Sequence, residues 1–239
     1  GAGTVVAGHV APPPARPEAP APALTRERIV RAGIGIADKE GLEAVSMRRV
    51  ASELGAGPMA LYRHIADKED LVLRMLDRVY ADVRLPEPPP SGWRAAAEAG
   101  AKALWEACHV HPWMAPATSM MRPQIMPGVL PLADYLLSAV AGLGLSHGDT
   151  FTAYLALLNF VRGMGTNLDA EAQQQALTGM DNEAWLATQE PAMREALASG
   201  DYPTFRRFTS REYDFDLDRI FEFGLQRLLD GLDALRSER

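Results

Sequence analysis

The chain has 239 residues, of which 47% are hydrophobic and 23% are charged. This composition is typical of one large or two small globular domains and excludes a chain that is disordered throughout. Its apolar runs are shorter than the roughly 18 to 20 residues of a membrane span, and its single cysteine, Cys108, excludes internal disulfides and a thiolate zinc finger. The formal net charge of −7 argues against a polybasic protein, although the acidic excess lies within residues 85–239 and residues 24–84 are nearly balanced. Because no leader sequence is visible either, we expect a cytoplasmic protein with no membrane partner.

Two proline clusters, at 12–22 and 86–90, divide the chain, because proline lacks a backbone N–H and cannot continue a helix. The segment before the first helix has few large apolar side chains with which to offset its ordering entropy. We therefore predict four regions: a disordered Ala/Pro-rich tail (1–23), a small domain (24–84), a proline-rich linker (85–91) and a larger domain (92–239).

Four helices are predicted in the small domain from apolar residues at helical spacing and from capping residues. The ranges are 26–40, about 46–55, 58–64 and about 68–84, with Thr25, Ser46, Pro58 and Asp67 at their starts. The fourth helix is the only rigid element expected to lead from the small domain into the larger one, so we expect it to transmit any signal between them.

Five more helices are predicted in the larger domain, at about 92–110, 127–143, 147–168, 182–198 and 214–236, around a broken segment from Pro112 to Pro123. Strand alternation is absent, so the fold class is all-α. The helices 147–168 and 214–236 are apolar over more than one stripe, which predicts a second buried surface. That surface belongs either to the core of a monomeric bundle or to a two-fold dimer, and we favour the dimer. A charge at Leu225 or Leu229 should then dissociate or unfold it.

The second and third helices, joined by Gly55-Ala56-Gly57, have the dimensions of a helix-turn-helix, whose second helix enters the major groove of DNA. Leu61 and Ile65 are four residues apart and should face the core. The side chains that this leaves pointing outward belong to Met59, Ala60, Tyr62, Arg63 and His64. With Arg48 before them and Lys68 after them, this surface suits a phosphate backbone. On spacing alone, a polar helical hairpin with no DNA partner remains the alternative.

Three stretches of the small domain together resemble the N-terminal domain of the tetracycline-repressor (TetR) family. They are Gly41-Leu42-Glu43-Ala44-Val45-Ser46-Met47-Arg48-Arg49 and on to Gly55, Leu61-Tyr62-Arg63-His64-Ile65, and Asp67-Lys68-Glu69-Asp70-Leu71. The resemblance covers about residues 25–80. It implies an all-helical homodimer with a three-helix DNA-binding head and a larger body that binds a small effector and then releases palindromic operator DNA. By the same resemblance, Ser46 and Arg48 contact phosphate or base, Tyr62, His64 and Lys68 hold the backbone, and Met59, Ala60 and Arg63 read bases.

The larger domain resembles the C-terminal domain of the tetracycline repressor more loosely, through Trp93, Met121-Arg122-Pro123, the 147–168 helix and Phe221-Glu222-Phe223-Gly224-Leu225. Arg122-Pro123 coincides with an effector-contacting Arg-Pro of the family. Thr118, in contrast, stands where the family has the histidine that binds drug-bound magnesium, which argues against tetracycline–magnesium as the effector.

Soft, aromatic and scarce polar side chains in the larger domain suit a planar, apolar, multi-ring ligand. The residues predicted to bind it are Trp105, His109, Trp113, Met120, Met121, Arg122, Phe151, Tyr154, Asn159 and Arg162, with Asn159 and Arg122 orienting it. The alternative for each apolar member is a place in the core. Cys108, His109 and His111 lack tetrahedral ligand spacing, so a metal or thiol sensor is the lesser alternative there.

The sequence thus favours a ligand-responsive transcriptional regulator, most simply a repressor, with no catalytic residues, no cofactor and no metal. Two alternatives stay open: a helical ligand-binding protein or enzyme that retains the head, and a scaffold dimer without a ligand. Specific binding to a palindrome would separate the first hypothesis from the other two.

Overall fold

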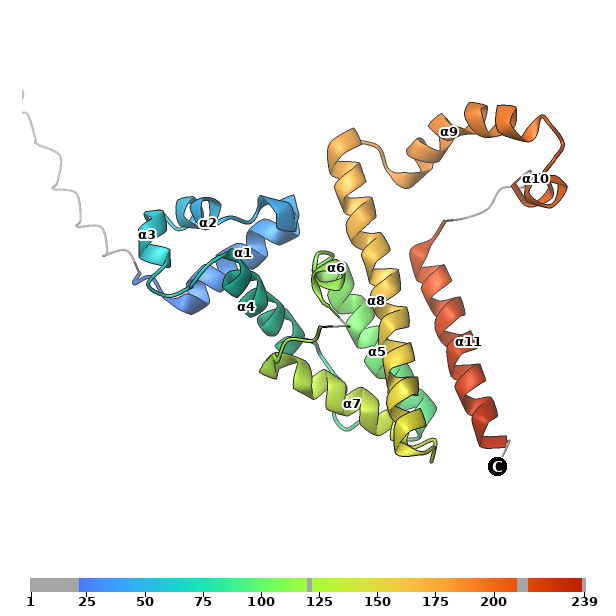
Figure 1. Ribbon diagram of the computed structural model, residues 1–239, viewed down its shortest axis with the longest axis horizontal. Helices are drawn as coiled ribbons and strands as arrows, with labels where there is room; N and C mark the ends of the chain where they lie inside the picture. The colour runs from blue at the N-terminus through green and yellow to red at the C-terminus, as the bar shows by residue number, and fades with distance from the viewer. Residues whose placement is uncertain (1–21, 120–121, 210–214, 238–239) are drawn as a thin grey trace, which may run out of the picture.

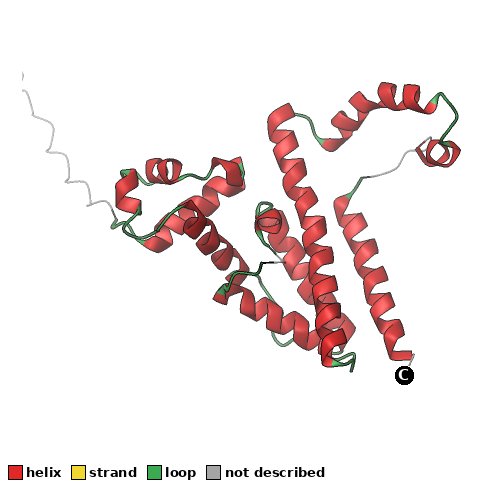
Figure 2. Cartoon of the chain, viewed as in Figure 1, coloured by secondary structure: helices red, strands yellow, loops and turns green. Residues whose placement is uncertain are grey.

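A computed structural model describes residues 22–119, 122–209 and 215–237, and within these ranges the chain forms helices and no strand (Figures 1 and 2). The ribbon shows a small helical domain, here called the head, joined through α4 to a larger helical domain, here called the body (Figure 1). None of the described helices combines the length and the apolar character needed to cross a membrane.

The head consists of α1 (Arg26–Glu40), the short 3-10 helix η1 (Leu42–Ala44), α2 (Met47–Glu53), α3 (Pro58–Leu61) and α4 (Lys68–Ala81). Side-chain oxygens of Thr25, Ser46 and Asp67 accept backbone N–H groups at the starts of α1, α2 and α4, as the sequence predicts. The head core contains fully buried side chains from all four α-helices and from the turn after α3: Ile29, Val50, Leu61, Ile65 and Leu71.

The body begins with α5 (Trp93–Val110), α6 (Met114–Ala117), η2 (Pro127–Val129) and α7 (Leu130–Ala141). The helices α5 and α7 cross closely at Gly100, where an added Cβ would lie 2.5 Å from a methyl carbon of Leu136. A larger residue there would require the side chains of Leu136 and Tyr135 to move. This crossing holds α7 against α5 and leaves the opposite side of α7 free to border a cavity.

The remaining helices are α8 (His147–Thr178), α9 (Asn182–Leu197), α10 (Pro203–Thr209) and α11 (Leu217–Ser237). The helix α8 is ten residues longer than the predicted 147–168, and α10 was not predicted. Beyond the end of α8, α9 and α10 stand away from the rest of the body (Figure 1). These two helices and the residues between them expose large apolar side chains: Trp185, Met193, Tyr202, Phe205 and Phe208.

The helix α11 lies beside α8, and the two approach closely at Gly224, where an added Cβ would lie 2.7 Å from the ring of Phe160. Leu225 and Leu229 of α11 are fully buried within the protomer, together with Phe221 and Leu232. Leu225 and Leu229 therefore belong to the core of the protomer, whereas the sequence analysis placed them in the contact between two copies. The large apolar side chains that α11 leaves exposed are Ile220, Phe223 and Leu235.

Candidate nucleic-acid interface and ligand cavity

The helix-turn-helix in the head is fixed by local interactions. Ser46 Oγ accepts the backbone N–H of Arg49 at 3.0 Å, which starts α2. Gly55 has a φ of +65°, a left-handed conformation that favours glycine, and it turns the chain after α2. Pro58 then opens α3 at a position where its missing N–H costs no hydrogen bond. The result is two short helices with a fixed turn between them.

The surface of α3 and the turn after it is unusually apolar for a solvent-facing segment. Leu61 and Ile65 are buried, whereas Met59 is 77% exposed and Tyr62 is 47% exposed. Arg63 also faces outward, while Ala60 and His64 are half-buried. The α-helix ends at Leu61 rather than at the predicted residue 64, so Tyr62, Arg63 and His64 lie in the turn that follows it.

The basic side chains around this surface differ in whether they are already paired. Arg49 contacts Glu40 at 2.6 Å and Glu53 at 2.8 Å, and these hydrogen bonds raise the pKa of its guanidinium above its usual value. In the described part of the chain, no carboxylate forms an ion pair with Arg48, Arg63 or Lys68. These three cations are therefore available to an external anion such as a DNA phosphate.

A cavity of about 1290 Å³ lies between α4 of the head and α5, α6, α7 and α8 of the body. Its wall is mainly apolar. From α4 come Val72, Leu73 and Leu76; from α5, Leu104 and Cys108; from α7, Leu130, Leu132, Ala133 and Leu137; and from α8, Phe151, Leu155 and Leu158. A large apolar cavity with few polar groups is the usual form of a small-molecule site.

Several polar groups of the cavity wall lie on α4, α8 and the segment that follows α6. The hydroxyl of Tyr80 lies 2.9 Å from Oγ1 of Thr118, which itself donates to the Met114 carbonyl at 2.8 Å. Arg162 Nε donates to the Ala115 carbonyl at 3.0 Å. Burial raises the pKa of the Tyr80 and Tyr154 phenols, and it raises the pKa of the Cys108 thiol to about 12. All three groups are therefore neutral at neutral pH.

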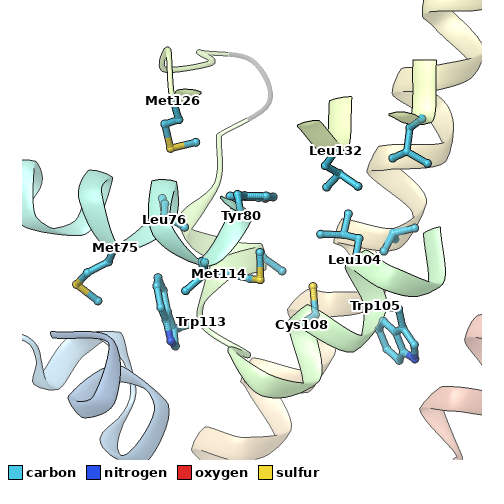
Figure 3. Packing of buried hydrophobic residues seen from close by; sticks show 14 of the residues in the cluster. Met75, Leu76, Tyr80, Leu104, Trp105, Cys108, Trp113, Met114, Met126 and Leu132 are labelled. Carbon is cyan, nitrogen blue, oxygen red and sulfur yellow. The ribbon is translucent and has the colours of Figure 1, made fainter. Parts of the chain in front are cut away.

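Four of the residues predicted to bind ligand line this cavity: Arg122, Phe151, Tyr154 and Arg162. Trp105 and His109 lie on the other side of α5, where Trp105 stacks on Phe221 of α11. The indole N–H of Trp105 and the Nε2 atom of His109 are both hydrogen-bonded to the carboxylate of Asp218. Figure 3 shows Leu104 and Cys108 pointing toward Tyr80 and Leu132, whereas Trp105 points the opposite way.

Trp113 and Asn159 are also absent from the cavity wall, which corrects their predicted positions. The ring of Trp113 is buried next to the head (Figure 3). Asn159 is exposed, and its amide donates to the carbonyl of Leu155 in its own helix at 2.9 Å. Met120 and Met121 lie outside the described residues.

Two cavity residues that the sequence analysis missed are Tyr80 and Thr118. The sequence analysis names no residue of α4 as a ligand contact, although Val72, Leu76 and Tyr80 recur at helical spacing and all line the cavity.

A second connection between head and body lies away from α4. Asp38 of α1 accepts the indole N–H of Trp113 at 2.7 Å and contacts His111 Nδ1 at 2.8 Å. Trp113 is directly followed by α6, which contributes to the cavity wall. The expectation that α4 is the only rigid link is therefore wrong, because α1 is tied to the α5–α6 connection as well.

Comparison with known proteins assigns both parts of the chain. Residues 29–75 match the family described as bacterial regulatory proteins, tetR family, and residues 85–236 match the tetracyclin repressor-like C-terminal domain. The chain is 38% identical over 222 residues to the HTH-type transcriptional repressor DrrR1 of Streptomyces coeruleorubidus, an alignment that covers 92% of this chain and 81% of the relative.

Solved structures agree with this assignment. Apo ActR from Streptomyces coelicolor superimposes with a TM-score of 0.73 at 27% sequence identity, covering 90% of this chain and 97% of ActR. ActR in complex with actinorhodin gives a TM-score of 0.71 at 27% identity, covering 87% and 95% of the two chains. Both structures are of the same relative, ActR, and each matches this chain over both its head and its body.

Proposed function

The chain belongs to the tetracycline-repressor (TetR) family of bacterial transcriptional regulators, and from this premise we propose that it is a repressor that a small multi-ring effector releases from a palindromic operator. The observation that carries the proposal is the position of α4. Its first residue, Lys68, follows the helix-turn-helix and has no ion pair among the described residues. Leu73, Leu76 and Tyr80 of the same helix line the cavity. A ligand in the cavity therefore contacts the helix that positions the DNA-binding surface.

In this proposal the head places α3 and the turn after it in the major groove. Arg48 and Lys68 bind phosphates on either side, with Ser46, Tyr62 and His64, while Met59, Ala60 and Arg63 face the base edges. An apolar Met59 and Ala60 suit thymine methyl groups, and Arg63 suits the acceptor edge of guanine. Operator DNA lies in the bacterial cytoplasm, so we propose that the protein acts there.

The proposed homodimer supplies two heads. One head offers too small a contact for specific binding, and two heads about 34–36 Å apart reach successive major grooves. Ile220 and Phe223 of α11 remain exposed on the protomer, and they continue the apolar face of a helix whose other side is buried. We assign this outer face of α11 to the contact with a second copy.

The effector is proposed to be a flat, multi-ring molecule. The wall of aliphatic and aromatic side chains supplies the affinity, and Arg122, Arg162 and Tyr154 supply the polar contacts. ActR, which is similar over most of this chain, binds actinorhodin. We propose that the cavity binds its ligand without converting it, as in a regulator.

The test is binding of the full-length protein to duplexes from the region upstream of its own gene, followed by addition of actinorhodin. We expect one palindrome to bind at least about a thousandfold more tightly than a scrambled duplex, with a steep dependence on salt. A tenfold loss of operator affinity on adding the compound corresponds to about 1.4 kcal/mol of coupling. Equal affinity for the palindrome and the scrambled duplex, or turnover of a bound compound, would contradict the proposal.

A further inference from the structure

The cation Arg162 lies on the cavity wall without a counter-ion. It is half-buried on α8, and its Nε is held by the Ala115 carbonyl. Among the residues that the structure describes, no carboxylate lies within ion-pair distance of its guanidinium. Two acids line the same cavity, Glu69 and Asp134, and neither pairs with it. The terminal nitrogens of Arg162 thus keep their donors free beside an apolar space.

The groups nearest to this end of the cavity do not neutralise the charge. The raised pKa values of Cys108, Tyr80 and Tyr154 keep all three uncharged at neutral pH. A partly buried cation among neutral groups is disfavoured because it loses hydration without gaining a partner. An incoming anion would therefore gain a large share of its affinity at this point.

We propose that the effector carries an acidic oxygen, as a carboxylate or an ionised phenol, and that Arg162 binds it. The inference rests on the proposed function in that it takes the cavity to be the effector site. A guanidinium presents parallel N–H donors that match the two oxygens of a carboxylate. The Tyr154 hydroxyl, which also lines the cavity, adds a further donor.

The other cations of the cavity are less suited to this role. Arg122 and Lys68 are exposed, so water already solvates their charges. An ion pair at an exposed site contributes little, whereas the same pair in a site shielded from water is stronger. Discrimination between an acidic ligand and its neutral analogue should therefore depend on Arg162.

The test uses two fluorescent compounds with the same aromatic frame, 8-anilinonaphthalene-1-sulfonate, which is an anion, and N-phenyl-1-naphthylamine, which is neutral. Each is titrated into the full-length protein without DNA. The variant Leu158→Trp fills the cavity with a larger side chain. The part of the fluorescence that this variant loses therefore comes from compound bound in the cavity. Arg162→Met should weaken cavity binding of the anion tenfold or more and that of the neutral compound by less than twofold.

Two further variants make the result specific. Arg162→Lys keeps the charge but not the paired donors, so it should recover part of the affinity for the anion. Arg219→Met removes an exposed arginine of α11 outside the cavity and should leave both compounds unaffected. Circular dichroism of each variant checks that it folds.

Equal weakening of both compounds by Arg162→Met, or unchanged affinity for the anion, overturns the inference while leaving the cavity as the ligand site. If Leu158→Trp removes no signal from either compound, the cavity binds neither. That result overturns this inference together with the cavity part of the proposed function. Specific operator binding, measured separately, then shows whether the DNA-binding part still stands.

Discussion

The head and the body are both made of helices, but the functional residues of the head lie on its outer surface and those of the body line a cavity. The head packs a core of its own, and we propose that it binds DNA through Met59, Tyr62 and the three cations that have no ion pair among the described residues, Arg48, Arg63 and Lys68. The body leaves a space of about 1290 Å³ inside and functions through the side chains around it. A functional surface can follow from local rules for caps and turns, whereas a functional cavity depends on how distant helices face one another.

The largest expected effect is a loss of stability, and it distinguishes the buried side of α11 from its exposed side. Leu225→Asp places a carboxylate in the core of the body, where it has no partner, and should lower the free energy of unfolding by about 4 kcal/mol or more. Phe223→Asp replaces a side chain that is 64% exposed on the protomer and should leave it folded but monomeric. Denaturant titration measures the first effect and light scattering the second. A Phe223→Asp protein that remained dimeric would place the contact between copies elsewhere.

A second prediction concerns the connection between the regions at Asp38. Asp38→Ala leaves the buried indole N–H of Trp113 without an acceptor, which should cost about 1–3 kcal/mol of stability. Asp38→Asn keeps one acceptor oxygen and should recover part of that loss. Glu43→Ala is a matched control, because it removes an exposed carboxylate from the same head. If Asp38→Ala and Glu43→Ala unfolded at the same denaturant concentration, the contact would contribute nothing.

The head also permits a comparison of neighbouring arginines, with a smaller expected effect. Arg48→Ala should weaken operator binding by about tenfold. It should also reduce the slope of log affinity against log salt concentration by the amount that corresponds to about one phosphate contact per head. Arg49→Ala removes a side chain already held by Glu40 and Glu53, so operator affinity should change much less. Fluorescence anisotropy at several salt concentrations measures both. Equal losses for the two variants would show that unpaired charge is not what selects the phosphate contact.

The two regions were also unequally predictable from the sequence. In the head, the caps at Thr25, Ser46 and Asp67 fixed the helix starts, since capping depends on residues within one turn. In the body, the sequence predicts the five longer helices but neither α6 nor α10, and it ends α8 ten residues early. Residues 169–178 have no apolar stripe, and their Ala, Gln and Glu residues favour a helix by intrinsic propensity instead.

The cavity was predicted least well because composition does not say which side of a helix faces it. Leu104 and Cys108 line the cavity, and Trp105 and His109 from the same turns pack on α11. Similarly, Leu158 and Arg162 line the cavity while Asn159 faces outward. The side of α8 that carries Phe151, Leu155 and Leu158 therefore borders the cavity, whereas Phe160 of the same helix packs on α11. The doubled stripe, which was assigned to a partner helix, is largely used within one protomer.

We propose that the body gives the protein its preference for the palindromic operator, because it holds two heads at the spacing of successive major grooves. The most direct measurement compares the affinity of the full-length protein for its complete palindrome with its affinity for a duplex of equal length that keeps one half-site and scrambles the other. We expect the complete palindrome to bind at least about a hundredfold more tightly, because the second head adds its contacts without a second association step. Equal affinity for the two duplexes would contradict the account.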